Sequence, residues 1–147
     1  MKVLHNICYG GFGLSNLAID AFAKRKGINL TWYKTERIGI GNDAKYTRVE
    51  KVVNSESIFR DLKPFTKDLG KTPKDPDGKL FYYPDFYKDE TRSDPDLIAV
   101  VEELGLDEAS APLSELAIEE IPDGASYDID EYDGMESVLP ARPSSFI

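Results

Sequence analysis

The first third of the chain changes from strand-like to helix-like spacing of its apolar residues. Residues 3–7, followed by Tyr9, form an apolar run with few charges, which predicts a first strand at the centre of a sheet. Residues 16–26 have near-helical apolar spacing and end in three basic residues before Gly27, which predicts a helix. Residues 30–33 are rich in β-formers and predict a second strand. This order favours a right-handed parallel crossover, with an antiparallel partner left open.

The second half contains the clearest helix signal. Ser93 or Asp94 suits the N-cap, and Pro95 suits the first helical position. Residues 97–104 then place apolar side chains on one helical face, and Gly105 ends the pattern. We therefore expect a second main helix that begins near residue 95.

Further strands are expected on both sides of this helix. Residues 116–121 and 127–132 predict two strands separated by a turn, and residues 58–60 predict another short one. The fold class is therefore α/β, with α+β not excluded, and two main helices pack on a mixed sheet of about four to six strands. Residues 1–139 are expected to form a single globular domain, and residues 140–147 an irregular C-terminal tail.

Loop residues and aromatic residues fill much of the middle of the chain. The cluster at 72–78 contains two prolines and a glycine, and is the best candidate for a mobile loop. Residues 81–87 include five aromatic side chains. Because aromatic side chains dominate burial energetics, we expect this segment at a core edge or an interface, with a stacking platform as the alternative.

Composition excludes several classes of protein. The chain has no run of about 18 apolar residues, so no membrane span is expected. The short apolar stretch at the N-terminus does not resemble a signal peptide. Cys8 is the only cysteine, which excludes an internal disulfide and fits a reducing cytoplasm. With His5 as the only histidine, a structural zinc site within one chain is also excluded. The sequence indicates no cofactor and no metal.

Charge is distributed unevenly along the chain. Residues 1–92 carry 17 Lys/Arg and 12 Asp/Glu, whereas residues 93–147 carry 15 Asp/Glu and a single basic residue, Arg142. The two halves can face each other within one fold or dock between subunits, so a homo-oligomer is expected. The overall acidity disfavours a general nucleic-acid binder.

A glycine-rich turn joins the first predicted strand to the first predicted helix. It lacks the Lys-Ser/Thr of a P-loop and the spacing of a dinucleotide fingerprint. Helix N-termini present unpaired N–H groups to anions, so the turn predicts an anion or nucleotide seat; the alternative is a tight turn of purely structural role. The candidate ligand-binding residues in this turn are Tyr9, Gly10, Gly11, Phe12, Gly13 and the N-cap Ser15.

Arg92 and Asp94 complete the candidate site. Arg92 is the last cation before the acidic half, and its guanidinium can clamp a phosphate or carboxylate. Alternatively, it pairs with Asp94 or Asp96 and has no further role.

Two other groups of residues have weaker signals. Asp128, Asp130, Glu131 and Asp133 form the densest carboxylate group, which can hold Mg²⁺ or Ca²⁺ or form a solvated acidic face. His5 is expected to be structural, and Cys8 is expected to be a buried, inert thiol rather than a nucleophile.

Several blocks of the sequence carry a resemblance to a known family. They are residues 7–15 (ICYGGFGLS), 66–70 (TKDLG), 92–105 (RSDPDLIAVVEELG), 120–124 (EIPDG) and 131–134 (EYDG). Together these blocks resemble a family of small proteins of tailed bacteriophages. Relatives often end in a basic tail with His, Arg and Trp, whereas this chain ends in ARPSSFI. The resemblance implies a phage accessory protein that acts in the host cytoplasm, and it supplies no catalytic residue.

These observations leave two main hypotheses from different classes. The leading one is a non-enzymatic protein that binds and sequesters a small anionic ligand, a nucleotide-type immune signal of bacterial anti-phage defence. The alternative is an acidic, protein-binding inhibitor of a host defence enzyme, which occupies a basic surface as a nucleic-acid mimic does. A small metal-dependent hydrolase built on the carboxylate group is a third hypothesis.

Overall fold

The computed structural model describes residues 1–37, 44–55 and 62–140, which form one small domain of mixed α+β class. The described part contains four α-helices, one 3₁₀ helix (η1) and seven strands. In chain order they are β1 (Lys2–Asn6), α1 (Asn16–Arg25), β2 (Thr31–Arg37), β3 (Ala44–Arg48), β4 (Leu62–Phe65), η1 (Gly78–Leu80), α2 (Asp89–Arg92), α3 (Pro95–Leu104), α4 (Leu106–Ala109), β5 (Leu116–Glu120), β6 (Tyr127–Tyr132) and β7 (Met135–Pro140).

The strands form three small sheets rather than one mixed sheet. Their orders are β1-β5, β3-β2-β4 and β6-β7, and all of these pairings are antiparallel. Because β1 and β2 belong to different sheets, the predicted parallel crossover is wrong, and so is the central position of β1. The reason lies in β2, whose residues 34–37 are polar and lie outside the core, whereas parallel strands need cover on both faces.

Both predicted main helices are confirmed, together with their capping residues. Ser15 caps α1 by accepting a 3.2 Å hydrogen bond from the N–H of the third helical residue, and Gly27 follows the helix with a φ of 78°. Asp94 caps α3 through a 2.9 Å bond, with Pro95 in the first helical position, and Gly105 ends the helix with a φ of 89°. These signals are local, which is why the sequence alone reveals them.

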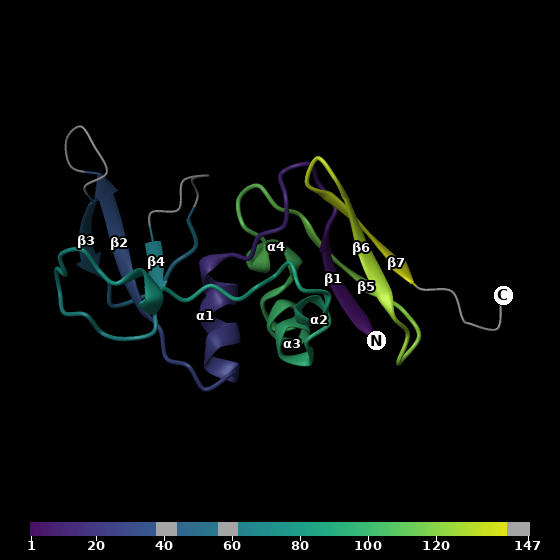
Figure 1. Cartoon of the computed structure of the whole chain (residues 1–147), viewed down its shortest axis with the longest axis horizontal. Coiled ribbons are helices and arrows are strands. Elements are labelled where there is room, and N and C mark those ends of the chain that lie inside the picture. The colour runs from purple at the N-terminus through teal and green to yellow at the C-terminus, as the bar shows by residue number, and fades with distance from the viewer. Residues whose placement is uncertain (38–43, 56–61, 141–147) are drawn as a thin grey trace.

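The two main helices lie side by side in the middle of the molecule (Figure 1). The β2–β4 sheet lies at one end, and the β1–β5 pair with the β6–β7 hairpin lies at the other. The core fills the space between helices and sheets, and its fully buried members include Leu4, Leu14, Ala18, Leu97, Val100, Val101 and Ala109.

The aromatic segment at residues 81–87 lies at an edge of this core, as expected. Phe86 is buried and its ring centroid is 5.6 Å from that of Phe12, whereas Phe81 packs on Phe65 of β4 at 5.9 Å. The segment therefore connects the β2–β4 sheet to the helical layer. Tyr87 at its end is 86% exposed.

The β6–β7 hairpin includes a strand that the sequence analysis did not predict. Its two-residue turn is Asp133-Gly134, with φ values of 49° and 89°, which is the arrangement that fits the twist of a tight hairpin. β7 extends the domain to Pro140, one residue beyond the expected boundary. The predicted strand at 58–60 and the tail at 141–147 lie outside the described residues.

Candidate functional site

Arg92, at the end of α2, is the most enclosed charged residue of the described chain. Its side chain is 2% exposed and forms a two-pronged ion pair with Glu136 of β7, at 2.7 Å from Nη1 to Oε1 and 2.9 Å from Nη2 to Oε2. Nε donates to the backbone oxygen of Phe86 at 2.6 Å, and Cζ lies 3.5 Å from the ring centroid of Phe12. The pair with Asp94 or Asp96 considered above is therefore wrong.

The ion pair also closes the free edge of β1. The N–H of Ile7 donates to the oxygen of Glu115, just before β5. By the alternation of an antiparallel strand, the backbone polar groups of Leu4 and Asn6 therefore point to the opposite edge of β1. There the N–H of Asn6 donates to Glu136 Oε1 at 2.9 Å, and Arg92 Nη1 donates to the oxygen of Leu4 at 3.4 Å. The two side chains thus take the place of a neighbouring strand.

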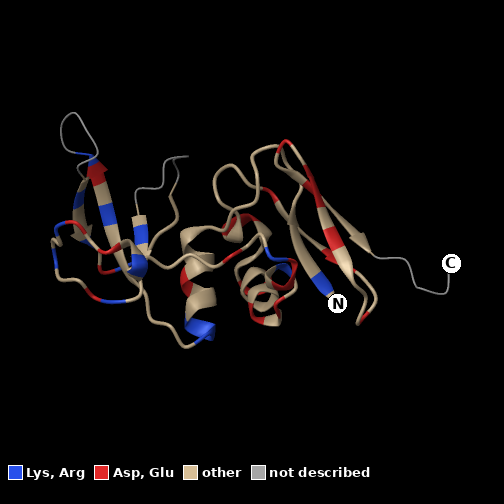
Figure 2. Ribbon diagram, in the orientation of Figure 1, with Lys and Arg blue, Asp and Glu red and all other residues tan. Residues whose placement is uncertain are grey.

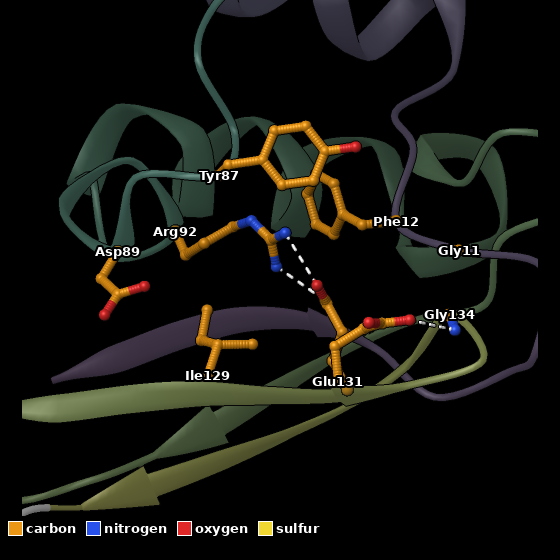
Figure 3. A pocket seen from close by; sticks show the side chains of 9 residues that line it. Gly11, Phe12, Tyr87, Asp89, Arg92, Ile129, Glu131 and Gly134 are labelled. Carbon is orange, nitrogen blue, oxygen red and sulfur yellow. Dashed lines mark hydrogen bonds and ion pairs between the residues drawn. The ribbon is translucent and has the colours of Figure 1, made fainter.

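Around this ion pair, three parts of the chain enclose a cavity of about 330 Å³ (Figure 3). The parts are the glycine turn, the α2 region and the β6–β7 hairpin. The lining residues are Gly11, Phe12, Tyr87, Asp89, Arg92, Ile129, Glu131, Gly134 and Glu136. Since Glu136 neutralises Arg92, the carboxylates of Asp89 and Glu131 leave the cavity with a net negative charge.

Asp89 and Glu131 differ in how they are held. The Asp89 carboxylate is half-buried and has no hydrogen-bond or ion-pair partner among the described residues. Glu131 Oε1 accepts a 2.5 Å bond from the N–H of Gly134 and so stays close to the hairpin turn. Tyr127 fixes α2 against β6, because its hydroxyl bonds to the Asp89 backbone oxygen and to Ser93 Oγ. Burial raises the pKa of Tyr127 above its ordinary value.

Two glycines near the turn are explained by close packing of backbone. A Cβ on Gly10 would lie 1.7 Å from the oxygen of Leu113, and a Cβ on Gly134 would lie 2.6 Å from the nitrogen of Gly11. Gly11 itself has a φ of 91°. The glycine turn, residues 111–114 and the hairpin turn therefore meet at distances that side chains would prevent, which supports the structural interpretation of the turn.

Among the predicted site residues, the structure brings Gly11, Phe12 and Arg92 together at the cavity. Gly10 and Gly13 do not line it. They line a smaller cavity of about 170 Å³, which Gly11 and Phe12 also border, beside residues 111–114.

The other three predicted residues lie elsewhere. Tyr9 is 66% exposed and lines neither of these two cavities. Ser15 serves as the cap of α1. Asp94 caps α3 and pairs with Lys26 at 2.8 Å, which ties the end of α1 to the start of α3. This pair, together with Asp96, raises the pKa of Lys26.

His5 and Cys8 have the environments of structural residues. His5 is buried in β1, and its Nδ1 has no hydrogen-bond partner among the described residues. Cys8 is half-buried rather than fully buried, and its Sγ lies 3.1 Å from the oxygen of Leu113. Within the described ranges, no group of His, Cys, Asp and Glu side chains is arranged to hold a metal ion.

The outward side of the hairpin forms a second notable surface, which we call the acidic face. It consists of Asp128, Asp130 and Tyr132 of β6 with Ser137 and Leu139 of β7, all of them exposed. Tyr132 is 73% exposed and Leu139 49%, and Asp128 lies opposite Leu139. No ion pair involves these carboxylates within the described part of the chain.

The charge balance differs between the two ends of the molecule: Lys and Arg are mixed with fewer Asp and Glu on the β2–β4 sheet and its loops, whereas Asp and Glu dominate the hairpin end (Figure 2). Residues 115–140 contain nine Asp/Glu and no Lys or Arg. Most of the Lys and Arg residues lie on the β2–β4 sheet and its connecting loops. The molecule therefore presents an acidic end and a basic end.

Sequence reasoning missed Glu136 and β7, which together enclose Arg92. A usable signal was present, because Asp133-Gly134 follows an alternating strand and precedes another alternating segment. That pattern identifies the hairpin, although it does not identify Arg92 as the partner of Glu136.

No family model, curated protein or solved structure matches this chain. The roles of the site residues therefore rest on geometry. In the described part of the chain, no helix is long and apolar enough to cross a bilayer.

Proposed function

We propose that this protein is a phage accessory protein that acts without catalysis in the host cytoplasm, by docking its acidic face on a basic surface of a host defence protein. One observation carries the proposal: the acidic face exposes carboxylates that no cation of the described chain neutralises. The basic surface is that of an enzyme that binds nucleic acid, since such a surface is built for dense negative charge. The bacteriophage resemblance supplies the biological setting.

The composition of the acidic face supports protein binding rather than mere solubility. Tyr132, two residues beyond Asp130, and Leu139, opposite Asp128, add exposed apolar area beside these carboxylates. Tyrosine is enriched at binding hot spots, because it buries a large ring and keeps a polar hydroxyl. The carboxylates accelerate encounter and select basic partners, while the apolar side chains supply contact energy.

Capture from a bacterial lysate treated with nuclease tests this proposal. Wild-type protein is compared with Asp128→Asn/Asp130→Asn and with Glu36→Gln/Glu50→Gln, which removes two charges at the opposite end. We expect the wild type and the Glu36→Gln/Glu50→Gln control to capture a nucleic-acid-binding protein. The hairpin variant, Asp128→Asn/Asp130→Asn, should fail to capture it. Added duplex DNA should release the captured protein. Equal capture by all three proteins, or capture that DNA leaves unchanged, would contradict the proposal.

A small anionic ligand at the glycine turn is a second candidate function. It is supported by the backbone N–H groups of Phe12 and Gly13, which donate no hydrogen bond within the described residues. It ranks below protein binding because Glu136 neutralises Arg92 and the adjoining cavity carries two further carboxylates. A screen of melting temperature against nucleotides and cyclic nucleotides tests it, since a ligand at 100 times its Kd stabilises by about 2.7 kcal/mol.

Self-association is part of the same proposal. An acidic end and a basic end on one molecule are complementary between two copies, which gives a head-to-tail contact that weakens as salt rises. Light scattering at low and high ionic strength measures it. A monomer at every salt and protein concentration would exclude this part of the proposal.

A further inference from the structure

We propose that the cavity between the glycine turn, the α2 region and the hairpin binds an arginine side chain, supplied by the partner protein. This inference rests on the proposed function, because it names the group that the basic partner inserts beside the acidic face. The cavity is separate from the acidic face, since Ile129 and Glu131 point to the opposite side of β6 from Asp128 and Asp130.

Charge is the first argument. Two of the three carboxylates that line the cavity, those of Asp89 and Glu131, lack a cation, and the only cation in its lining is already paired. The Asp89 carboxylate has no hydrogen-bond or ion-pair partner among the described residues, and only one oxygen of Glu131 bonds to the hairpin turn. A cationic group that enters the cavity therefore finds two acceptors on opposite walls, one on α2 and one on β6 (Figure 3).

The second argument is the arrangement that already surrounds Arg92. That guanidinium lies 3.5 Å from the ring centroid of Phe12 and forms two bonds to one carboxylate. The cavity offers the same two elements a second time, with the exposed ring of Tyr87 and the carboxylates of Asp89 and Glu131. Tyr87 has no ring contact or hydrogen bond through its side chain within the described part, so its face is available.

These features favour guanidinium over other cations. A guanidinium is planar, weakly hydrated and able to stack on an aromatic ring while it donates sideways to carboxylates. An ammonium is more strongly hydrated and acts as a point charge. Ile129 offers an apolar surface for the methylene stem. A volume of about 330 Å³ accommodates one side chain of this size, at the small end of ligand cavities.

The test is a titration of the full chain with N-acetyl-arginine amide, followed by chemical-shift changes. The lysine and citrulline amides serve as comparison ligands. We expect saturable shifts at residues around the cavity, with affinity for arginine above that for lysine and none for citrulline. Binding of lysine and arginine with equal affinity would overturn the guanidinium assignment, and unsaturable or scattered shifts would overturn the site.

Matched variants locate the site. Asp89→Asn and Glu131→Gln should each weaken arginine binding by at least about tenfold, since each removes one of the two charged acceptors of the guanidinium. Glu131→Gln keeps an acceptor for the Gly134 N–H, so the hairpin turn is preserved. The control is Glu90→Gln, the exposed neighbour of Asp89 that does not line the cavity, which should leave arginine binding unchanged. An equal loss in the control would show nonspecific attraction and overturn the proposal.

The same variants separate this inference from the proposed function. If the lysate partner is captured normally by Asp89→Asn and no arginine amide binds to the wild type, the acidic face acts alone and the cavity assignment is wrong. If arginine amide binds but no partner depends on Asp128 and Asp130, the cavity assignment holds and the proposed docking of the acidic face is wrong.

Discussion

The two ends of the molecule are both small antiparallel sheets, yet different forces attach them to the helices. At the basic end, buried Trp32 of β2 packs in the core, and its Nε1 donates to Asp20 of α1 at 2.8 Å. Within that sheet, Tyr33 and Phe65 pack edge to face at 5.5 Å. At the acidic end, the buried pair of Arg92 and Glu136 joins α2, β1 and β7. One end depends on buried aromatic side chains, and the other on a desolvated ion pair together with the hydrogen bonds of Tyr127.

This difference explains how the hairpin can expose a strongly acidic surface and still be held in one position on the domain. Breaking a buried ion pair is costly, since the remaining charge has no water around it, so the pair holds the hairpin in one position. Every other carboxylate of the hairpin then stays on the outside or in the cavity. The aromatic contacts of the basic end are less directional and tolerate changes of shape more readily.

Removal of Glu136 should have the largest effect. Glu136→Ala leaves Arg92 buried without its partner and frees the edge of β1, so we expect a loss of about 3–5 kcal/mol in the free energy of unfolding. Urea unfolding measures this loss, and hydrogen exchange should show the amides of β6 and β7 opening first. A loss below about 1 kcal/mol would show that the pair does not hold the hairpin.

Truncation at the basic end should cost somewhat less. Phe65→Ala removes a buried ring that contacts Tyr33, Tyr46 and Phe81, and we expect a loss of about 3 kcal/mol. Hydrogen exchange should increase in β2–β4 and remain unchanged in β6–β7. Opening of both ends together would mean that the two sheets do not respond separately.

A pair of glycine substitutions tests the tight packing at the hairpin turn. Gly134 and Gly124 both have positive φ, but a Cβ meets backbone only at Gly134. Gly124→Ala should therefore cost about 1 kcal/mol, from conformation alone. Gly134→Ala should cost at least about 2 kcal/mol, because the glycine turn must also move. Equal losses in thermal or urea unfolding would refute the close approach.

The smallest effect concerns pH dependence at the basic end. The hydrogen bond that the Gly70 N–H donates to the Asp68 carboxylate lowers the pKa of Asp68 below its ordinary value, and the hydrogen bond from Arg48 lowers it further. A carboxyl group whose pKa is lower in the folded protein stabilises the fold at pH values above its pKa in the unfolded chain, about 3.9. This stabilisation is lost as the pH falls through the pKa of the group in the folded protein. Asp68→Asn should thus melt at a slightly lower temperature than wild type at pH 7. The difference should disappear in strong acid, and a difference independent of pH would contradict this cause.

How far the sequence predicts this molecule depends on the range of each interaction. The caps at Ser15 and Asp94 and the helix ends at Gly27 and Gly105 follow from residues a few positions apart, so they were predicted correctly. The pairing of Arg92 with Glu136 joins residues 44 positions apart. Charge pattern alone does not select this carboxylate among its neighbours, and so the burial of Arg92 was missed.

The arrangement of strands shows the same limit. Each of β1, β2, β5 and β6 was recognised from local composition, but their division into three sheets depends on which faces the helices cover. The glycine turn was recognised as a special backbone feature, yet its main contacts are to residues 111–114 and to Gly134, far along the chain. Sequence spacing therefore located the site without revealing its composition or its charge.

The affinity for an arginine-rich peptide at low and high salt is the most direct measurement of the central claim. We predict salt-sensitive binding by the wild type and by Glu36→Gln/Glu50→Gln. Asp128→Asn/Asp130→Asn should bind at least about tenfold more weakly, with a smaller salt dependence, because the acidic face loses its charge. Identical affinities for the hairpin variant and the control would contradict the claim that the acidic face is the docking surface.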